Sequence, residues 1–200
     1  GQDWGEWSNF YQFSGETFQS ESPRRYLQLE LILSTEDPEV APAVNSLSIE
    51  FEDALVQEAR GSVWPRQAPP NEETSFTYTL WPAAGVEDRR FDLLRFAAPG
   101  PVDLQSIGLE IGGQPAVPAS VDLRSDSLFV VLPQAVLADS VRISFTARLL
   151  QNATVFALDL GLRQRPGLWQ SVEAAERRAN IVMIPQLTGS TQLIGDLRFS

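Results

Sequence analysis

The stretch SVRISFTARL, residues 140–149, alternates apolar and polar side chains along its whole length. One side carries only apolar residues: Val141, Ile143, Phe145, Ala147 and Leu149. Successive side chains of a β-strand point to opposite faces, so a period of two predicts a strand with one buried face. The stretch therefore predicts a sheet that packs one side against a core.

Similar short apolar segments recur along the chain, separated by turn residues and spaced roughly 8–15 residues apart. They are SFTYTLW (75–81), RFDLLRF (90–96), SIGLEI (106–111), SLFVVLP (127–133), TVFALDL (154–160), ANIVMIP (179–185) and TQLIGDLRFS (191–200). The 14 Pro and 13 Gly supply frequent breaks between them. This pattern predicts an all-β protein, an antiparallel β-sandwich of the jelly-roll or immunoglobulin-like type.

The segment SVEAAERRAN, residues 171–180, is the one ambiguous stretch, because it contains strong helix formers. It fits a short helix, or the end of a strand at LWQSV followed by a polar turn. We favour the strand and turn because the surrounding segments all read as β.

Two further alternating segments lie near the N-terminus: YLQLELIL (26–33) and SLSIEFE (46–52). The acidic stretch between them contains Pro38 and Pro42, which prevent either a strand or a helix from continuing through it. The period of two predicts a pair of strands joined by a solvated loop. We expect a small N-terminal β module over residues 1–58.

Residues 59–74, ARGSVWPRQAPPNEET, contain three prolines and mostly polar side chains. Such composition is typical of a linker between domains. The chain therefore divides, by expectation, into a module at 1–58, a linker at 59–74 and a sandwich domain at 75–200.

Composition removes many kinds of chemistry. The chain has no Cys, no His and no Lys, so thiol nucleophiles, common zinc sites, a histidine general base and Schiff-base lysines are all excluded. A glycosidase would need two carboxylates across a cleft, and the sequence places no such pair. We expect no enzymatic activity.

The net charge of −11 opposes binding to nucleic acid. No apolar run reaches the roughly 20 residues that a membrane-spanning helix needs, so we expect no membrane insertion. The first residues, GQDWGEW, contain no apolar core of a signal peptide, which favours a mature or excised segment.

Two groups of residues are candidate sites. Glu36, Asp37 and Glu39 are hard-oxygen ligands in one loop and could contribute to a calcium site, but EF-hand spacing is absent and we favour a solvated loop. We expect no other cofactor.

The second group is aromatic: Trp4, Trp7 and Tyr11, with Phe10 and Phe13 nearby. Aromatic faces bind sugar rings by apolar contact, so these residues form a candidate carbohydrate platform. The alternative is packing against a sheet edge or a neighbouring domain.

Charged residues near the strand pair suggest ion pairs. Arg24 and Arg25 precede the first strand, and Glu50, Glu52 and Asp53 end the second. Arginine binds carboxylates in a fork geometry, so such pairs would fix the strand ends, a structural role.

The residues RRYLQLELILSTEDPEVAPAVNSLSIEF (24–51) resemble a module of large secreted bacterial surface proteins. The RYLQ strand, the Pro-punctuated ST-D-P loop and the second alternating strand resemble the end of a discoidin-like (galactose-binding-like) or jelly-roll β-sandwich. DWGEWSNF (3–10) resembles its Trp-rich opening strand. The segments from TSFTYTLWP to TVFALDL resemble the sandwich that follows this module in some such proteins.

The resemblance implies an extracellular or cell-surface location in a bacterium. Together with the missing catalytic residue types, it implies a non-catalytic structural, adhesive or assembly module of a larger protein. Its expected partners are neighbouring domains or identical subunits, contacted through sheet edges. The alternative function is carbohydrate binding, with a polysaccharide as partner.

Overall fold

The computed structural model describes residues 6–16, 18–20, 26–37, 39–51, 53–85, 88–97 and 100–185. These residues form thirteen strands and no helix, which confirms the all-β prediction. The strands are β1 (Glu58–Trp64), β2 (Glu73–Ala83), β3 (Phe91–Ala97), β4 (Val102–Ile111), β5 (Gln114–Ala116), β6 (Ser120–Arg124), β7 (Ser127–Val136), β8 (Val141–Arg148), β9 (Ala153–Val155), β10 (Leu158–Leu162), β11 (Arg165–Ser171), β12 (Glu173–Ala174) and β13 (Ile181–Met183).

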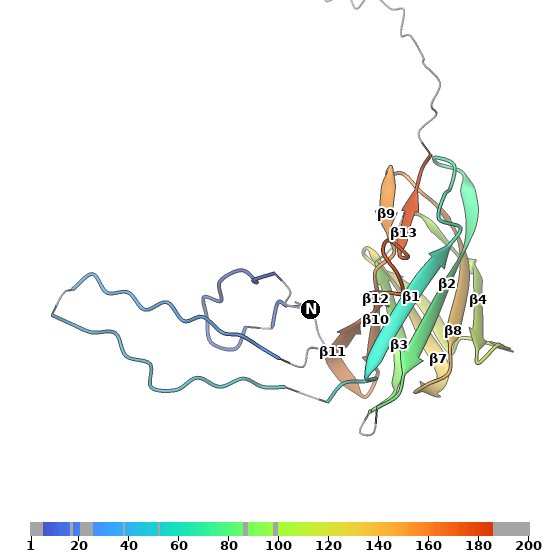
Figure 1. Ribbon diagram of the computed structural model, residues 1–200. Helices are drawn as coiled ribbons and strands as arrows, with labels where there is room; N and C mark the ends of the chain where they lie inside the picture. Colours follow the sequence, from blue (N-terminus) through green and yellow to red (C-terminus); the bar gives the residue numbers. More distant parts are fainter. Residues whose placement is uncertain are drawn as a thin grey trace, which may run out of the picture.

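The strands form a β-sandwich (Figure 1). One sheet has six strands in the order β12-β1-β2-β8-β4-β5, and the other has five in the order β11-β10-β3-β7-β6. A small third sheet pairs β13 with β9. Neighbours pair antiparallel except for β1 and β12, which pair parallel. The more specific assignment to the jelly-roll or immunoglobulin-like type stays a prediction.

Strand β8 behaves as its sequence predicts. Val141, Ile143, Phe145 and Ala147 are buried, and the side chains between them are partly or fully exposed. The strand pairs with β2 on one side and β4 on the other, so it lies inside its sheet. The segments 75–81, 90–96, 106–111 and 127–133 are likewise strands β2, β3, β4 and β7.

Five aromatic rings join the two large sheets. Phe76 and Tyr78 on β2 and Phe145 on β8 come from the six-stranded sheet, Phe96 on β3 from the five-stranded sheet, and Phe156 from the connection between β9 and β10. Tyr78 packs edge-on against Phe96 with ring centroids 5.2 Å apart, and Phe76 lies 5.2 Å from Phe156. Such pairs stabilise a core beyond the area that they bury.

Tyr78 fits only because residue 61 on the neighbouring strand is glycine. A Cβ at Gly61 would lie 2.0 Å from the Tyr78 hydroxyl oxygen. That hydroxyl is buried and has no hydrogen-bond partner among the described residues. Burial raises the pKa of Tyr78 above its ordinary value of 10.0, and the negative charge of Asp159 raises it further.

The prediction of strands at 26–33 and 46–52 is wrong for the described residues of both segments. Residues 26–37 and 39–51, here called the arm, belong to no sheet and are exposed. In Figure 1 the arm projects away from the two large sheets. A strand needs a neighbour to bond with, and the described part of the chain supplies none here. The separate module at 1–58 stays a prediction.

The predicted linker at 59–74 is also wrong in its first half. Residues 58–64 form β1, which pairs with β2 along seven residue pairs. Ala59 and Val63 are buried in the core. Buried positions therefore alternate with less buried positions along this strand. The prolines follow the strand instead of separating two domains.

At the C-terminal end, residues 171–180 form no helix. Strand β11 ends at Ser171, the two-residue strand β12 follows, and a turn precedes β13, which confirms the strand-and-turn prediction. The predicted strand at 154–160 is two strands, β9 and β10, and the segment 191–200 lies outside the described residues.

The arm joins the sandwich through a well-bonded junction. Leu55 and Val56 are fully buried, and their backbone N–H groups donate to Gln170 Oε1 at 2.9 and 3.2 Å. Gln170 Nε2 donates to the Val56 carbonyl at 2.8 Å. Arg89 Nη2 donates to Asp53 Oδ2 at 2.9 Å. Arg24 and Arg25 lie outside the described residues, so their expected pairing with Asp53 stays a prediction.

We predict that Tyr78→Phe raises the free energy of unfolding by about 1 kcal/mol, because it removes a buried hydroxyl that lacks a partner. A phenol whose pKa is raised on folding contributes stability below its unfolded pKa that is lost as the pH rises above about 10. The variant should therefore lose less stability than the wild type in strong alkali. Urea unfolding at several pH values measures both effects, with exposed Tyr26→Phe as control. A less stable Tyr78→Phe would contradict the prediction.

We predict that Gln170→Leu lowers the free energy of unfolding by about 2–3 kcal/mol, because it leaves the buried N–H groups of Leu55 and Val56 unpaired. The matched control is Gln114→Leu at an exposed position of β5, which should change stability by no more than about 0.5 kcal/mol. Hydrogen exchange of the Leu55 and Val56 amides gives a local readout. Unchanged exchange at these two amides would show that Gln170 does not hold the junction.

Candidate functional site

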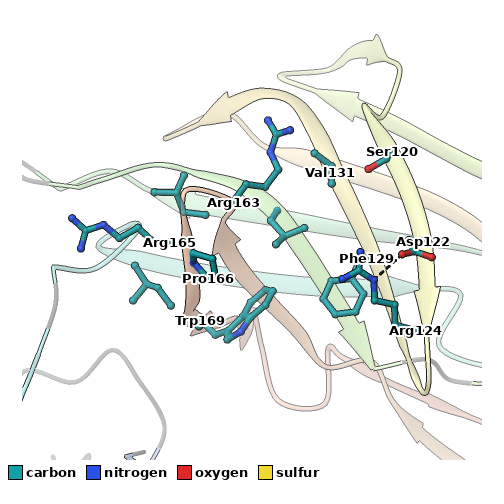
Figure 2. Close-up of a pocket in the computed structure, with 13 residues that line it drawn as sticks. Ser120, Asp122, Arg124, Phe129, Val131, Arg163, Arg165, Pro166 and Trp169 are labelled. Atoms are coloured by element: carbon teal, nitrogen blue, oxygen red, sulfur yellow. Dashed lines mark hydrogen bonds and ion pairs between the residues drawn. The ribbon is translucent and has the colours of Figure 1, made fainter.

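A hollow of about 340 Å³ lies on the outer face of the five-stranded sheet (Figure 2). Residues from β3, β6, β7, β10 and β11, and from the turn between the last two, line it. They are Leu93, Ser120, Asp122, Arg124, Phe129, Val131, Leu162, Arg163, Arg165, Pro166, Gly167, Leu168 and Trp169.

Strand register explains why these residues meet. Directly paired positions give one row across the sheet: Trp169, Gly161, Leu93, Val131 and Ser120. On the inner strands, the neighbours Leu94, Val130 and Leu132 are buried in the core, as the period of two requires. The floor of the hollow is therefore made by residues that lie far apart in the sequence.

A second row runs parallel to the first: Ser171, Asp159, Arg95, Phe129 and Asp122. Arg95 Nε and Nη2 donate to Asp159 Oδ2 at 3.0 and 2.8 Å. Ser171 Oγ donates to the other oxygen of the same carboxylate at 2.8 Å. These bonds fix the guanidinium of Arg95 in one place on the sheet.

Residues of both rows contact the side chain of Trp169. A Cβ at Gly161 would lie 2.6 Å from the Trp169 ring, so the glycine makes room for the indole on the sheet surface. The guanidinium carbon of Arg95 lies 4.2 Å from the Trp169 ring centroid, a cation–π contact. Phe129 lies 6.2 Å away, centroid to centroid. Arg95 itself does not line the hollow, but it contacts the indole that does.

Three arginines other than Arg95 line the hollow. Arg163 donates from its backbone N–H and its Nε to the two oxygens of the buried Asp92, both at 2.9 Å. Arg124 donates from Nε to Asp122 at 2.7 Å and lies over the ring of Phe129 at 5.3 Å. Arg165 comes from β11, across the hollow from Arg124 in Figure 2.

The side chains that line the hollow are mostly apolar or basic. Among the described residues, Asp122 is the one carboxylate that lines it, whereas a glycosidase uses two. Ser120 places a hydroxyl in the hollow, but the chain contains no histidine that could activate it. What remains is an apolar floor with guanidinium groups at its margin, a surface suited to an anion that carries an apolar face.

The predicted aromatic platform lies elsewhere. Trp4 is outside the described residues, while Trp7 is 63% exposed and Phe10 and Phe13 are also exposed. Tyr11 stacks on Phe18 with centroids 6.3 Å apart, and its hydroxyl accepts a hydrogen bond from the Gln19 N–H. The carbohydrate role of this group stays a prediction.

The acidic loop shows local bonding within the chain. Asp37 Oδ1 accepts a bond from the Glu39 N–H at 2.9 Å, and the Asp37 N–H donates to Thr35 Oγ1 at 3.1 Å. Among the described residues no three acidic side chains are grouped as metal ligands would be. The calcium prediction for Glu36, Asp37 and Glu39 therefore gains no support and stays a prediction. Arg24, Arg25 and Glu52 lie outside the described residues.

No protein-family model matches this chain. No curated protein sequence matches it. Within the described residues, no helix has both the length and the apolar character needed to cross a membrane.

Several solved structures resemble this chain distantly, including the three that follow. The N-terminal domain of an adhesin from Streptococcus gordonii is 9% identical, with a TM-score of 0.48, over 66% of this chain and 34% of that one. The major pilin SpaA of Corynebacterium diphtheriae is 13% identical, with a TM-score of 0.38, over 56% and 33%. The Reelin-N domain of F-spondin is 10% identical, with a TM-score of 0.37, over 67% and 91%.

This chain spans about a third of the length of the adhesin and pilin chains that it matches. At these identities and TM-scores the neighbours carry no functional argument.

We predict that Gly161→Ala displaces the Trp169 ring and lowers the free energy of unfolding by about 1–3 kcal/mol, because the new methyl overlaps the indole. The same change in a Trp169→Leu background should cost at least 1 kcal/mol less. Urea unfolding of the four proteins measures the coupling, and Trp fluorescence reports the displaced ring. Equal costs in both backgrounds would show that the glycine is needed for another reason.

Proposed function

We propose that this chain is a non-catalytic structural and adhesive module of a larger extracellular bacterial protein, and that it assembles through the arm. The supporting observation is the exposed alternating pattern of residues 26–33 and 46–51.

The arm exposes large apolar side chains at alternate positions. Leu27, Leu29, Leu31 and Leu33 are all exposed, and so are Leu47, Ile49 and Phe51, the last of these at 88%. Burying apolar surface stabilises a protein by about 25 cal/mol per Å², so leaving seven such side chains in water forgoes a large stabilisation. Several large apolar side chains exposed in one segment favour an interaction site.

The spacing indicates the kind of partner. A period of two places apolar side chains on one face of an extended chain and leaves the backbone N–H and C=O groups free to pair with another strand. A sheet edge of a neighbouring domain or subunit satisfies both needs at once, as in β-strand addition. The arm leaves the sandwich from the bonded junction at Leu55 and Val56, so a partner on the arm would be tied firmly to the sandwich.

The non-catalytic part of the proposal has separate support. The chain lacks His, Cys and Lys, and the one hollow described above carries a single carboxylate. The extracellular bacterial location is supported by the resemblance of residues 24–51 to modules of secreted surface proteins. Adhesion and spacing are functions that need surfaces and stability rather than reactive groups.

We predict that Leu29→Asp with Leu31→Asp weakens assembly at least tenfold, because two charges on the apolar face oppose its burial. The matched control is Gln28→Asp, which adds a charge on the opposite face and should change assembly less than threefold. Sedimentation of the chain at increasing concentration measures self-association, and capture of the intact parent protein by the immobilised chain measures docking. A chain that stays monomeric and captures no parent would contradict the proposal.

A further inference from the structure

We propose that the hollow on the five-stranded sheet binds a carboxylate-bearing sugar of an acidic polysaccharide, a hexuronate. This site is distinct from the aromatic group near the N-terminus, and it is independent of assembly through the arm. The proposal rests on charge, on the geometry of two arginines, on the aromatic wall and on the size of the hollow.

The hollow is lined by several basic groups, although the molecule as a whole is acidic. The chain carries a net charge of −11. Arg124, Arg163 and Arg165 line the hollow together with Asp122, and Arg163 also pairs with the buried Asp92. An anion is repelled by most of an acidic surface, so three guanidinium groups in one hollow favour anions at this place. The ligand should therefore be negatively charged.

Two of these arginines are oriented for a carboxylate. Arg124 and Arg163 are each held through Nε, by Asp122 and Asp92 respectively. Among the described residues, no hydrogen bond engages the terminal Nη groups of either side chain. A guanidinium anchored at Nε keeps its terminal N–H groups for a second acceptor, and carboxylates are the acceptors that fit this geometry best. Anchoring also reduces the side-chain entropy lost on binding.

The wall of the hollow suits a ring with an apolar face. Trp169 is fixed by Arg95, which is itself fixed by Asp159, and Phe129 lies beside it. Aromatic faces pack against the C–H groups of a pyranose ring. Ser120 and Asp122 add polar groups at the β6 side that can bind sugar hydroxyls. A simple inorganic anion would leave this apolar surface unused.

Size and position favour a sugar over an acidic peptide. A volume of about 340 Å³ lies at the small end of ligand pockets, which span about 300–1,000 Å³. Extended peptides bind chiefly by main-chain pairing along a sheet edge, whereas the hollow crosses the face of the sheet, from β11 at one edge to β6 at the other. The acidic segment STEDPEVAP of a second copy is the peptide alternative that the test includes.

The test is a calorimetric titration of the whole chain with trigalacturonate, with neutral galactotriose and with the synthetic peptide STEDPEVAP. We expect trigalacturonate to bind, to bind at least tenfold tighter than galactotriose, and to weaken as salt is added. Trp fluorescence should change on binding because Trp169 lines the hollow.

Variants locate the site. Arg124→Gln should weaken trigalacturonate binding at least tenfold, as should Trp169→Ala. Arg142→Gln removes an exposed arginine that pairs with Glu110 on the other sheet, and it should leave binding within twofold. Arg124 is exposed and contacts the exposed Asp122 and the ring of Phe129, so its loss should not unfold the protein, and urea unfolding checks this.

Absence of trigalacturonate binding would overturn the proposal, as would equal affinity for galactotriose or equal weakening by Arg142→Gln. Tighter binding of the peptide would assign the hollow to assembly of copies instead. The arm variant Leu29→Asp with Leu31→Asp should bind trigalacturonate like the wild type, which separates this result from the outcome for the proposed function.

Discussion

The contact between Tyr78 and Phe96 is the constraint on which the rest of the molecule depends, because it joins β2 of one sheet to β3 of the other. Phe145 continues the contact on the six-stranded side, 5.9 Å from Phe96. Once Phe96 points into the core, the period of two sends Arg95 outward. The strands that pair with β3 then place Asp159 and Phe129 beside Arg95. The core packing thus decides which residues the outer face presents.

Periodicity predicts strands well where the chain supplies a covering layer. Residues 140–149 and 75–81 alternate and are core strands, while 26–33 alternates as clearly and belongs to no sheet among the described residues. An alternating pattern indicates that one face of a strand is suited to burial, but it does not identify the surface that covers this face. The predicted linker at 59–74 is wrong for a related reason. The prolines of this segment favour a linker, whereas the apolar positions Ala59 and Val63, which are buried, give only a weak strand pattern.

The hollow could not be predicted from the sequence, because its residues meet only through the strand order β11-β10-β3-β7-β6. No local spacing connects Arg124 with Arg163 or Trp169. One local signal exists: Gly161 interrupts an apolar strand, and a glycine inside a strand often marks the close approach of another group. Here that group is the indole of Trp169. The signal points to a close contact but does not identify its partner.

Strand β11 connects the two surfaces through neighbouring residues. Trp169 points outward and lines the hollow, and Gln170 points inward and binds the backbone at Leu55 and Val56. A partner bound to the arm would therefore be linked to the sandwich through β11, next to the Trp169 ring that forms the wall of the hollow. Pro166 and Gly167 lie on the same strand, which forms one edge of its sheet, and proline at an edge blocks pairing with further strands. Strand β11 is thus protected at its edge while each of its two faces serves a different surface.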